Sequence, residues 1–146
     1  MSESVEVYML DKKQLEHYQG KINKCLDDSP ETWALRFRDK EEIWHNVYTD
    51  YVQMWAVCDA DCIHCVFMTE IVSHPKRVLR LFWAYGNGLV KSFPLVDMVV
   101  DRFATGMECE AIEITGRRGW EKVIKANGGE FMCSTYRRPV RLVKGH

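Results

Sequence analysis

Three consecutive segments in which apolar residues recur at every second position constrain the fold of this chain more than any other feature. They span residues 52–58, 62–72 and 77–85, and short polar turns at 59–61 and 73–76 separate them. A period of two is typical of β-strands, and turns of this length join antiparallel neighbours. The sequence therefore predicts a three-stranded antiparallel meander.

Helical patterns precede the meander. After a short apolar and acidic alternation at residues 5–9, Asp11 can cap a helix that ends near residues 27–30 and buries one apolar face. Ser29-Pro30 opens a second helical stretch that is less periodic. The residues Lys40-Glu41-Glu42 fit either a loop or the exposed face of one long helix, so the sequence leaves the internal break open.

A crossover pattern follows the meander. Apolar residues recur at spacings of three and four up to about Gly106, and Pro94 suits the first turn of this helix. A strand at 111–115, a helix at 118–127 and a last strand at 131–136 complete the order. This order predicts a mixed α/β (α+β) sheet with one βαβ crossover.

Length and composition limit the function classes. The chain has 146 residues, of which 47% are hydrophobic, so we expect a single domain over 1–146, with a helical part at about 1–50 and a sheet part at about 51–146. A net charge of -1 argues against a nucleic-acid partner, and the basic run at 137–144 fits a solvated strand edge. No apolar run is long enough to span a membrane and the start is acidic, which predicts a cytoplasmic protein without a membrane partner.

The six cysteines predict reduced, mostly buried thiols. Cys58, Cys62, Cys65 and His64 come close together in the sequence, but residues 62 and 65 of one strand point to opposite faces. We therefore predict no metal site.

The turn Tyr85-Gly86-Asn87-Gly88-Leu89 has the parts of an anion-binding loop. Glycines let the main chain approach a ligand closely, and the start of the following helix carries a partial positive charge. A strand-to-helix turn that needs a positive φ angle explains the same glycines without a ligand.

Four segments together resemble the GNAT-type acyl-CoA N-acyltransferases. They are Trp55-Ala56-Val57, the run from Met68 to Pro75, Gly86-Asn87-Gly88-Leu89, and the run from Ile114 to Ile124, which contains Gly116-Arg117-Arg118-Gly119-Trp120. Within this family the chain is most similar to small acyltransferase-like proteins of tailed bacteriophages and prophages. The resemblance extends from about Trp55 to Val140.

This resemblance implies a GNAT-like sheet that is splayed after the third meander strand, with acetyl-CoA or coenzyme A in the gap. The thioester is expected near the backbone of residues 82–85 and the pyrophosphate on the glycine turn. The implied cofactor-binding residues are Phe82, Trp83, Ala84, Tyr85, Gly86, Asn87, Gly88, Leu89, Arg117 and Arg118. The two arginines fit either a bound phosphate or ion pairs with Glu113 and Glu121.

The chain also departs from typical members of the family. Trp83-Ala84-Tyr85 precedes the first glycine, where a basic residue is usual, and Ile124 or Lys125 occupies the position of the usual tyrosine acid. The remaining candidates for catalysis are Glu70, Glu113 and Tyr85, with Tyr136 on the last strand. Glu113 fits either a general base acting through water or a side chain that faces solvent or pairs with Arg117.

Two functions are therefore expected. In the first, the protein moves an acetyl group from coenzyme A to an unidentified amine. In the second, it is a catalytically inactive binding or assembly protein of a phage particle or its ejection apparatus, with other phage proteins or itself as partners. The first places it in the host cytoplasm and the second in the virion.

Overall fold

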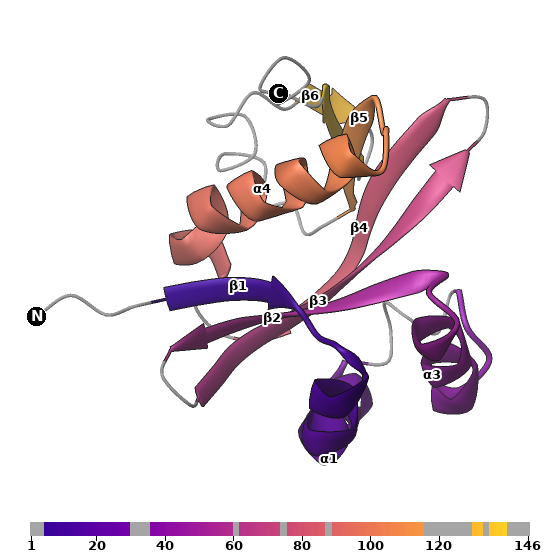
Figure 1. Cartoon of the computed structure of the whole chain (residues 1–146), viewed down its shortest axis with the longest axis vertical. Helices are drawn as coiled ribbons and strands as arrows, with labels where there is room; N and C mark the ends of the chain where they lie inside the picture. Colours follow the sequence, from indigo (N-terminus) through magenta and orange to yellow (C-terminus); the bar gives the residue numbers. More distant parts are fainter. Residues whose placement is uncertain are drawn as a thin grey trace, which may run out of the picture.

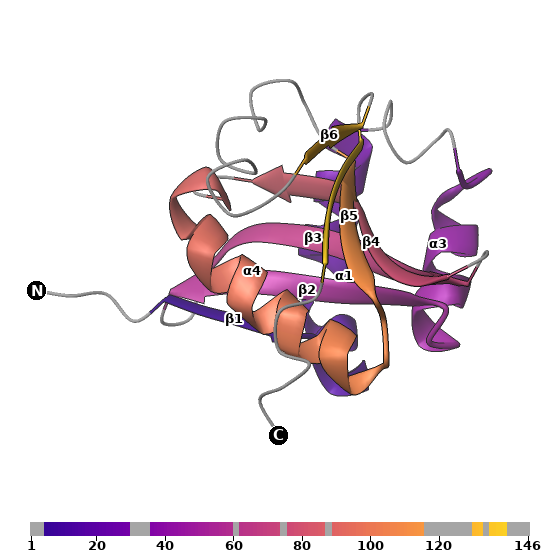
Figure 2. The same cartoon turned by 90° about the horizontal axis from the view of Figure 1, so that it is seen from above.

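In the computed structural model, the described residues form a seven-stranded sheet with the strand order β1-β2-β3-β4-β5-β7-β6. The structure describes residues 5–29, 36–59, 62–73, 76–86, 89–115, 130–132 and 135–139. The strands are β1 Val5–Met9, β2 Val52–Asp59, β3 Cys62–Ser73, β4 Arg77–Gly86, β5 Ala111–Thr115, β6 Glu130–Met132 and β7 Thr135–Pro139. The helices are α1 Lys12–Asp28, α3 Lys40–Tyr48 and α4 Leu89–Gly106. Helix α4 covers one face of the sheet, and α1 and α3 cover the other (Figures 1 and 2).

The predicted meander is confirmed. Strand β3 pairs antiparallel with both β2 and β4. The alternation at residues 5–9 forms a further strand, β1, which pairs antiparallel with β2 and brings Val7 opposite Val57. The predicted order omitted this strand because five alternating residues give only a weak signal before a partner strand is known.

The two helices on one face begin at aspartate caps. The Asp11 side chain accepts a hydrogen bond from the Gln14 backbone, and the Gln14 side chain accepts one from the Asp11 backbone, which forms a capping box. The Asp39 side chain accepts from the Glu42 backbone at the start of α3. The break that the sequence left open therefore falls before Lys40, and residues 40–42 form the first turn of a short helix.

Helix α4 begins earlier than predicted. It starts at Leu89, so Pro94 lies inside the helix rather than in its first turn. Proline has no backbone N–H, so this position cannot donate the helical hydrogen bond to the carbonyl of Val90. Burial of Phe93 against the sheet accompanies helix formation on the N-terminal side of the proline.

The predicted crossover is confirmed, because β4 and β5 are parallel and α4 connects them. The predicted last strand at 131–136 is wrong in its extent: the segment holds two antiparallel strands, β6 and β7, on either side of residues 133 and 134. Strand β7 pairs antiparallel with β5. The predicted helix at 118–127 lies outside the described residues.

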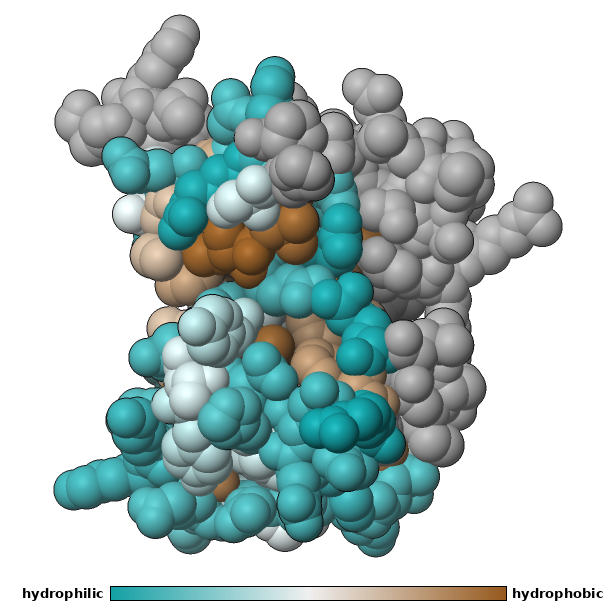
Figure 3. Space-filling model, turned by 90° about the vertical axis from the view of Figure 1, so that its right-hand side faces the viewer, coloured by the Kyte–Doolittle hydropathy of each residue, from teal (hydrophilic) through white to brown (hydrophobic). Residues whose placement is uncertain are grey.

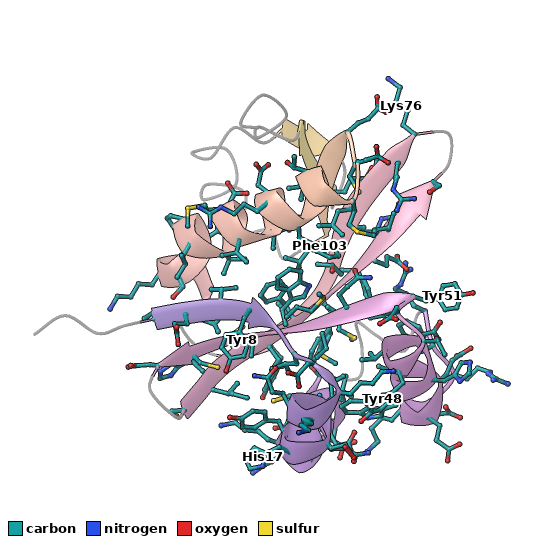
Figure 4. The ribbon with its side chains drawn as sticks, in the orientation of Figure 1. Tyr8, His17, Tyr48, Tyr51, Lys76 and Phe103 are labelled. Atoms are coloured by element: carbon teal, nitrogen blue, oxygen red, sulfur yellow. The ribbon has the colours of Figure 1, made fainter. Side chains whose placement is uncertain are left out.

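Each face of the sheet carries a hydrophobic cluster. Under α4, Trp55 packs between Phe67, whose ring centroid is 5.6 Å away, and Phe103, at 5.4 Å. Figure 4 shows Phe103 pointing from α4 toward the sheet. Under α1 and α3, the cluster includes Ile22, Ile43 and Trp83.

The cysteines within the described residues are free thiols. Cys58, Cys65 and Cys109 are buried, Cys25 is half-buried and Cys62 is exposed. Burial raises the pKa of Cys65 to about 12. In the described part of the chain, no three potential metal ligands come together, and no helix has the length and apolar character needed to cross a membrane.

Candidate functional site

The pairing of β4 with β5 ends halfway along β4. Their parallel pairing runs from Val78 opposite Ala111 to Leu81 opposite Ile114. The pairing of β4 with β3 continues to Gly86. Among the described residues, 82–86 of β4 therefore pair with β3 only, and their other edge has no strand partner.

A β-bulge in β4 lies where the pairing of this strand with β5 ends. Trp83 is opposite Met68 and Leu81 is opposite Thr69, so Phe82 is an extra residue in β4. Because of this residue, Phe82 and Trp83 both pack into the cluster under α1 and α3. A bulge interrupts the regular ladder and redirects backbone groups, and bulges are common beside active sites.

The side chains of β4 that are predicted to bind the cofactor mostly have partners elsewhere in the protein. The Trp83 indole donates to the Ser29 hydroxyl at 3.1 Å, and the Tyr85 hydroxyl donates to an Asp28 carboxylate oxygen at 3.4 Å. Phe82 is buried, and Ala84 packs under α4. These residues of β4 can thus offer a ligand their backbone groups rather than their polar side-chain atoms.

Gly86 has the positive φ angle that the ligand-free explanation of the turn requires. Its φ is +130°, and a Cβ atom there would lie 2.3 Å from the His64 carbonyl oxygen and 2.7 Å from the Cα of Cys65. The close approach at this glycine is to strand β3. Asn87 and Gly88 lie outside the described residues, as do Arg117 and Arg118.

Helix α4 begins at Leu89, three residues after Gly86. Its first turn contains Lys91, which is exposed. The N–H groups of a first helical turn and a nearby ammonium group favour an anion. Lys91 was missed in the sequence, because placing the helix start at Pro94 put this lysine in the loop.

Charged residues face each other across β3, β4 and β5. Glu70 is opposite Arg80, and Arg80 is opposite Glu113. Arg80 Nε and Nη2 both donate to Glu113 Oε1 at 3.2 Å, and Arg80 Nη1 lies 3.8 Å from Glu70 Oε2. Arg36, from the segment between α1 and α3, forms an ion pair with Glu70.

This arrangement corrects one prediction for Glu113. The residue is 6% exposed and pairs with Arg80, so it does not face solvent. Sequence reasoning missed Arg80 and Arg36. Counting outward from the turn at 73–76 pairs Glu70 with Arg80, whereas nothing in the sequence brings Arg36 to this place.

Solved structures share this arrangement of strands and helices. A probable acetyltransferase of Staphylococcus epidermidis superposes with a TM-score of 0.70 at 9% identity, over 94% of this chain and 100% of that one. The fold is that of the GNAT acetyltransferases. No protein-family model matches the sequence, and no curated protein resembles it significantly.

Two further similar structures contain acetyl-CoA or coenzyme A. A predicted acetyltransferase of Clostridium acetobutylicum, solved with acetyl-CoA, has a TM-score of 0.60 at 13% identity, over 89% of this chain and 92% of that one. The PaiA N-acetyltransferase of Thermoplasma acidophilum, in complex with coenzyme A, has a TM-score of 0.62 at 11% identity, over 93% of this chain and 99% of that one. At these identities the likeness shows the fold, and the function needs its own argument.

Proposed function

We propose that the protein transfers an acetyl group from acetyl-CoA to an amine. The observation that carries this proposal is the one-sided strand edge of residues 82–86, which begins at a bulge and leads toward the start of α4. An extended thioester chain can lie along such an edge, and phosphates can bind at the helix start. In this proposal, residues 82–86 and the start of α4 hold the two ends of acetyl-CoA.

In this proposal the cofactor is bound mainly by backbone groups. Residues 82–86 provide the backbone groups for the thioester arm, and Lys91 adds a positive charge in the first turn of α4. Arg117 and Arg118, which follow β5, stay candidates for phosphate contacts. The absence of a basic residue at Trp83-Ala84-Tyr85 predicts modest affinity.

Acetyl-CoA supplies an activated acyl thioester. The amine attacks the carbonyl carbon directly, a backbone N–H of β4 stabilises the developing oxyanion, and the C–S bond breaks to give the N-acetyl product and coenzyme A. The attacking amine loses one proton and the thiolate gains one. Tyr85, on the part of β4 that pairs only with β3, is the candidate for proton donation, which requires its hydroxyl to leave Asp28. Glu70 and Glu113 are candidates for proton acceptance.

Calorimetric titration with acetyl-CoA tests the proposal. We expect a dissociation constant below about 100 μM, and absence of heat at millimolar ligand would overturn the proposal. Lys91→Glu should weaken binding about 3- to 10-fold by removing a phosphate contact and adding repulsion. Lys13→Glu is the matched control, because Lys13 is an exposed lysine in the first turn of α1, and it should leave binding unchanged.

The alternative is a non-catalytic assembly protein of a phage particle. Two sequence features favour it, namely the missing basic residue before Gly86 and the missing tyrosine at Ile124 or Lys125. Under this alternative the protein is present in purified particles and releases no coenzyme A with any amine. Turnover of acetyl-CoA by a protein that is absent from particles would exclude it and favour an enzyme of the host cytoplasm.

A further inference from the structure

Four charged residues form a connected group on the face of the sheet that α1 and α3 cover. This arginine–glutamate cluster consists of Arg36, Glu70, Arg80 and Glu113. Glu70 is in contact with both arginines, and Arg80 is in contact with both glutamates. The cluster is therefore one network rather than separate surface ion pairs.

The two arginine side chains are more exposed to solvent than the two glutamate side chains. The side chains of Arg36 and Arg80 are 34% and 31% exposed, whereas those of Glu70 and Glu113 are 15% and 7% exposed. A guanidinium has five N–H donors, more than a single carboxylate can accept. The cluster thus presents guanidinium groups to solvent and keeps its carboxylates beneath them.

The Arg36 guanidinium is also fixed in orientation. Its central carbon lies 4.6 Å from the centroid of the Phe82 ring, and Glu70 binds the same group from the sheet. A guanidinium held on an aromatic ring and by a carboxylate is preorganised for a second planar acid group. Such a group loses little conformational entropy when it binds a ligand.

The cluster lies next to the point where the pairing of β4 with β5 ends. Arg80 and Glu113 form the rung before the last pair, Leu81 and Ile114, and one residue advances about 3.3 Å along a strand. Phe82, which supports Arg36, is the bulge residue itself. Figure 3 shows the molecule from the side on which α3 and the β3–β4 hairpin lie. On this side a hydrophobic patch borders hydrophilic surface.

We infer that the acceptor amine carries an acidic group and that Arg36 and Arg80 bind this group. The inference rests on the proposed function, because it assumes that the thioester lies at the bulge. An acceptor that approaches from the face opposite α4 then meets both guanidinium groups within one or two residues of the acetyl group. Glu70 and Glu113, the candidates for proton acceptance, also orient the two arginines in this inference.

Matched pairs of amines test this inference. Coenzyme A release is measured with each common amino acid and its α-amide, and with phosphoethanolamine and ethanolamine, so that the members of each pair differ in the acidic group. We expect at least one acid-bearing amine to exceed its neutral counterpart in kcat/KM by about 10-fold or more, the effect of one charge-assisted hydrogen bond. The two kinds of pair distinguish a carboxylate from a phosphate.

Variants of Arg36 assign the preference to the cluster. Arg36→Gln should reduce the preference to about twofold or less, and Arg36→Lys, which keeps the charge but loses the planar fork, should retain part of it. The dissociation constant of acetyl-CoA should not change in either variant. Arg38→Gln is the control, since the Arg38 side chain is 84% exposed and pairs with Glu42. Thermal unfolding by circular dichroism establishes that each variant is folded.

Equal use of charged and neutral amines, or a preference that survives in folded Arg36→Gln, would overturn the inference alone. The inference would also be overturned if the protein bound acetyl-CoA but no acid-bearing amine either reacted or gave calorimetric binding. Absence of acetyl-CoA binding would overturn the proposed function and, with it, this inference.

Discussion

Only glycine fits at position 86, because its φ angle is positive and the His64 carbonyl oxygen lies close to it. A Cβ at φ +130° would collide with the His64 carbonyl oxygen on β3. We expect Gly86→Ala to lower the free energy of unfolding by about 2 kcal/mol or more, because either the backbone or strand β3 must move. Urea denaturation measures this change.

Gly20 provides the control for that substitution. It lies within α1, and a Cβ there would have nothing within 4 Å. Gly20→Ala should raise the free energy of unfolding by about 0.5–1 kcal/mol, since alanine favours a helix. If the two substitutions had the same effect, the close contact between β3 and β4 at Gly86 would be contradicted.

Arg80 stabilises the fold through its buried partner. Arg80→Met removes the group that binds the Glu113 carboxylate, and we expect a loss of about 2–4 kcal/mol in unfolding free energy. Arg38→Met removes an exposed pair with Glu42 and should cost less than about 1 kcal/mol. Equal losses in urea denaturation would contradict the burial of the cluster.

The two partners of Arg80 differ in how far the sequence predicts them. Glu70 and Arg80 belong to a hairpin with a short turn, so counting from the turn gives their register. Glu113 reaches Arg80 only after the crossover through α4, and the register of a parallel pair does not follow from a loop length. For this reason the sequence paired Glu113 with its neighbour Arg117.

At the scale of elements, α4 contains the clearest conflict between sequence and structure. Pro94 lies inside it, where it removes a backbone hydrogen bond and crowds the preceding turn. Burial of Phe93 on the sheet offsets this cost. A proline inside a helix commonly bends it, and we propose that Pro94 sets the direction of the first turn, the proposed phosphate site.

Pro94→Ala tests this role of the proline. We expect the variant to be more stable by about 1–3 kcal/mol, because alanine restores the hydrogen bond. Binding of acetyl-CoA should weaken at the same time, because the first turn is reoriented. Thermal unfolding and calorimetry measure the two quantities, and a variant that gains neither stability nor a change in affinity would contradict the account of α4.

For the whole molecule, alkaline pH should lower stability. Burial raises the pKa of Cys65 from 9.0 to about 12, and a hydrogen bond with Cys58, with burial, raises that of Tyr8 from 10.0 to about 12. Between pH 9 and 12 the unfolded chain therefore releases protons that the folded protein retains, so this stabilisation is complete below about pH 9 and is lost as the pH rises toward 12.

Urea denaturation from pH 7 to 11 measures this loss. Cys65→Ala removes one of the two titrations, so its unfolding free energy should fall less steeply with pH than that of the natural chain. A stability that stays constant up to pH 11 would contradict the burial of these groups.

The sequence predicts most of the sheet because the meander and the crossover depend on local patterns. Hydrophobic alternation gives β2, β3 and β4, and helical periodicity gives α1 and most of α4. The bulge at Phe82 and the cluster around Arg36 depend on contacts between segments that are distant in the sequence, so no local pattern predicts them. The single-domain assignment and the roles of Arg117 and Arg118 remain predictions.

Hydrogen–deuterium exchange with and without acetyl-CoA tests most directly whether the cofactor binds between β4 and β5. We predict slower exchange of the backbone amides in residues 82–86 and in the first turn of α4 when acetyl-CoA is bound. Strands β1 and β2, which lie at the other end of the sheet, should not change. Protection confined to β1, β2 or α1, or saturating acetyl-CoA without protection of residues 82–86, would contradict this account.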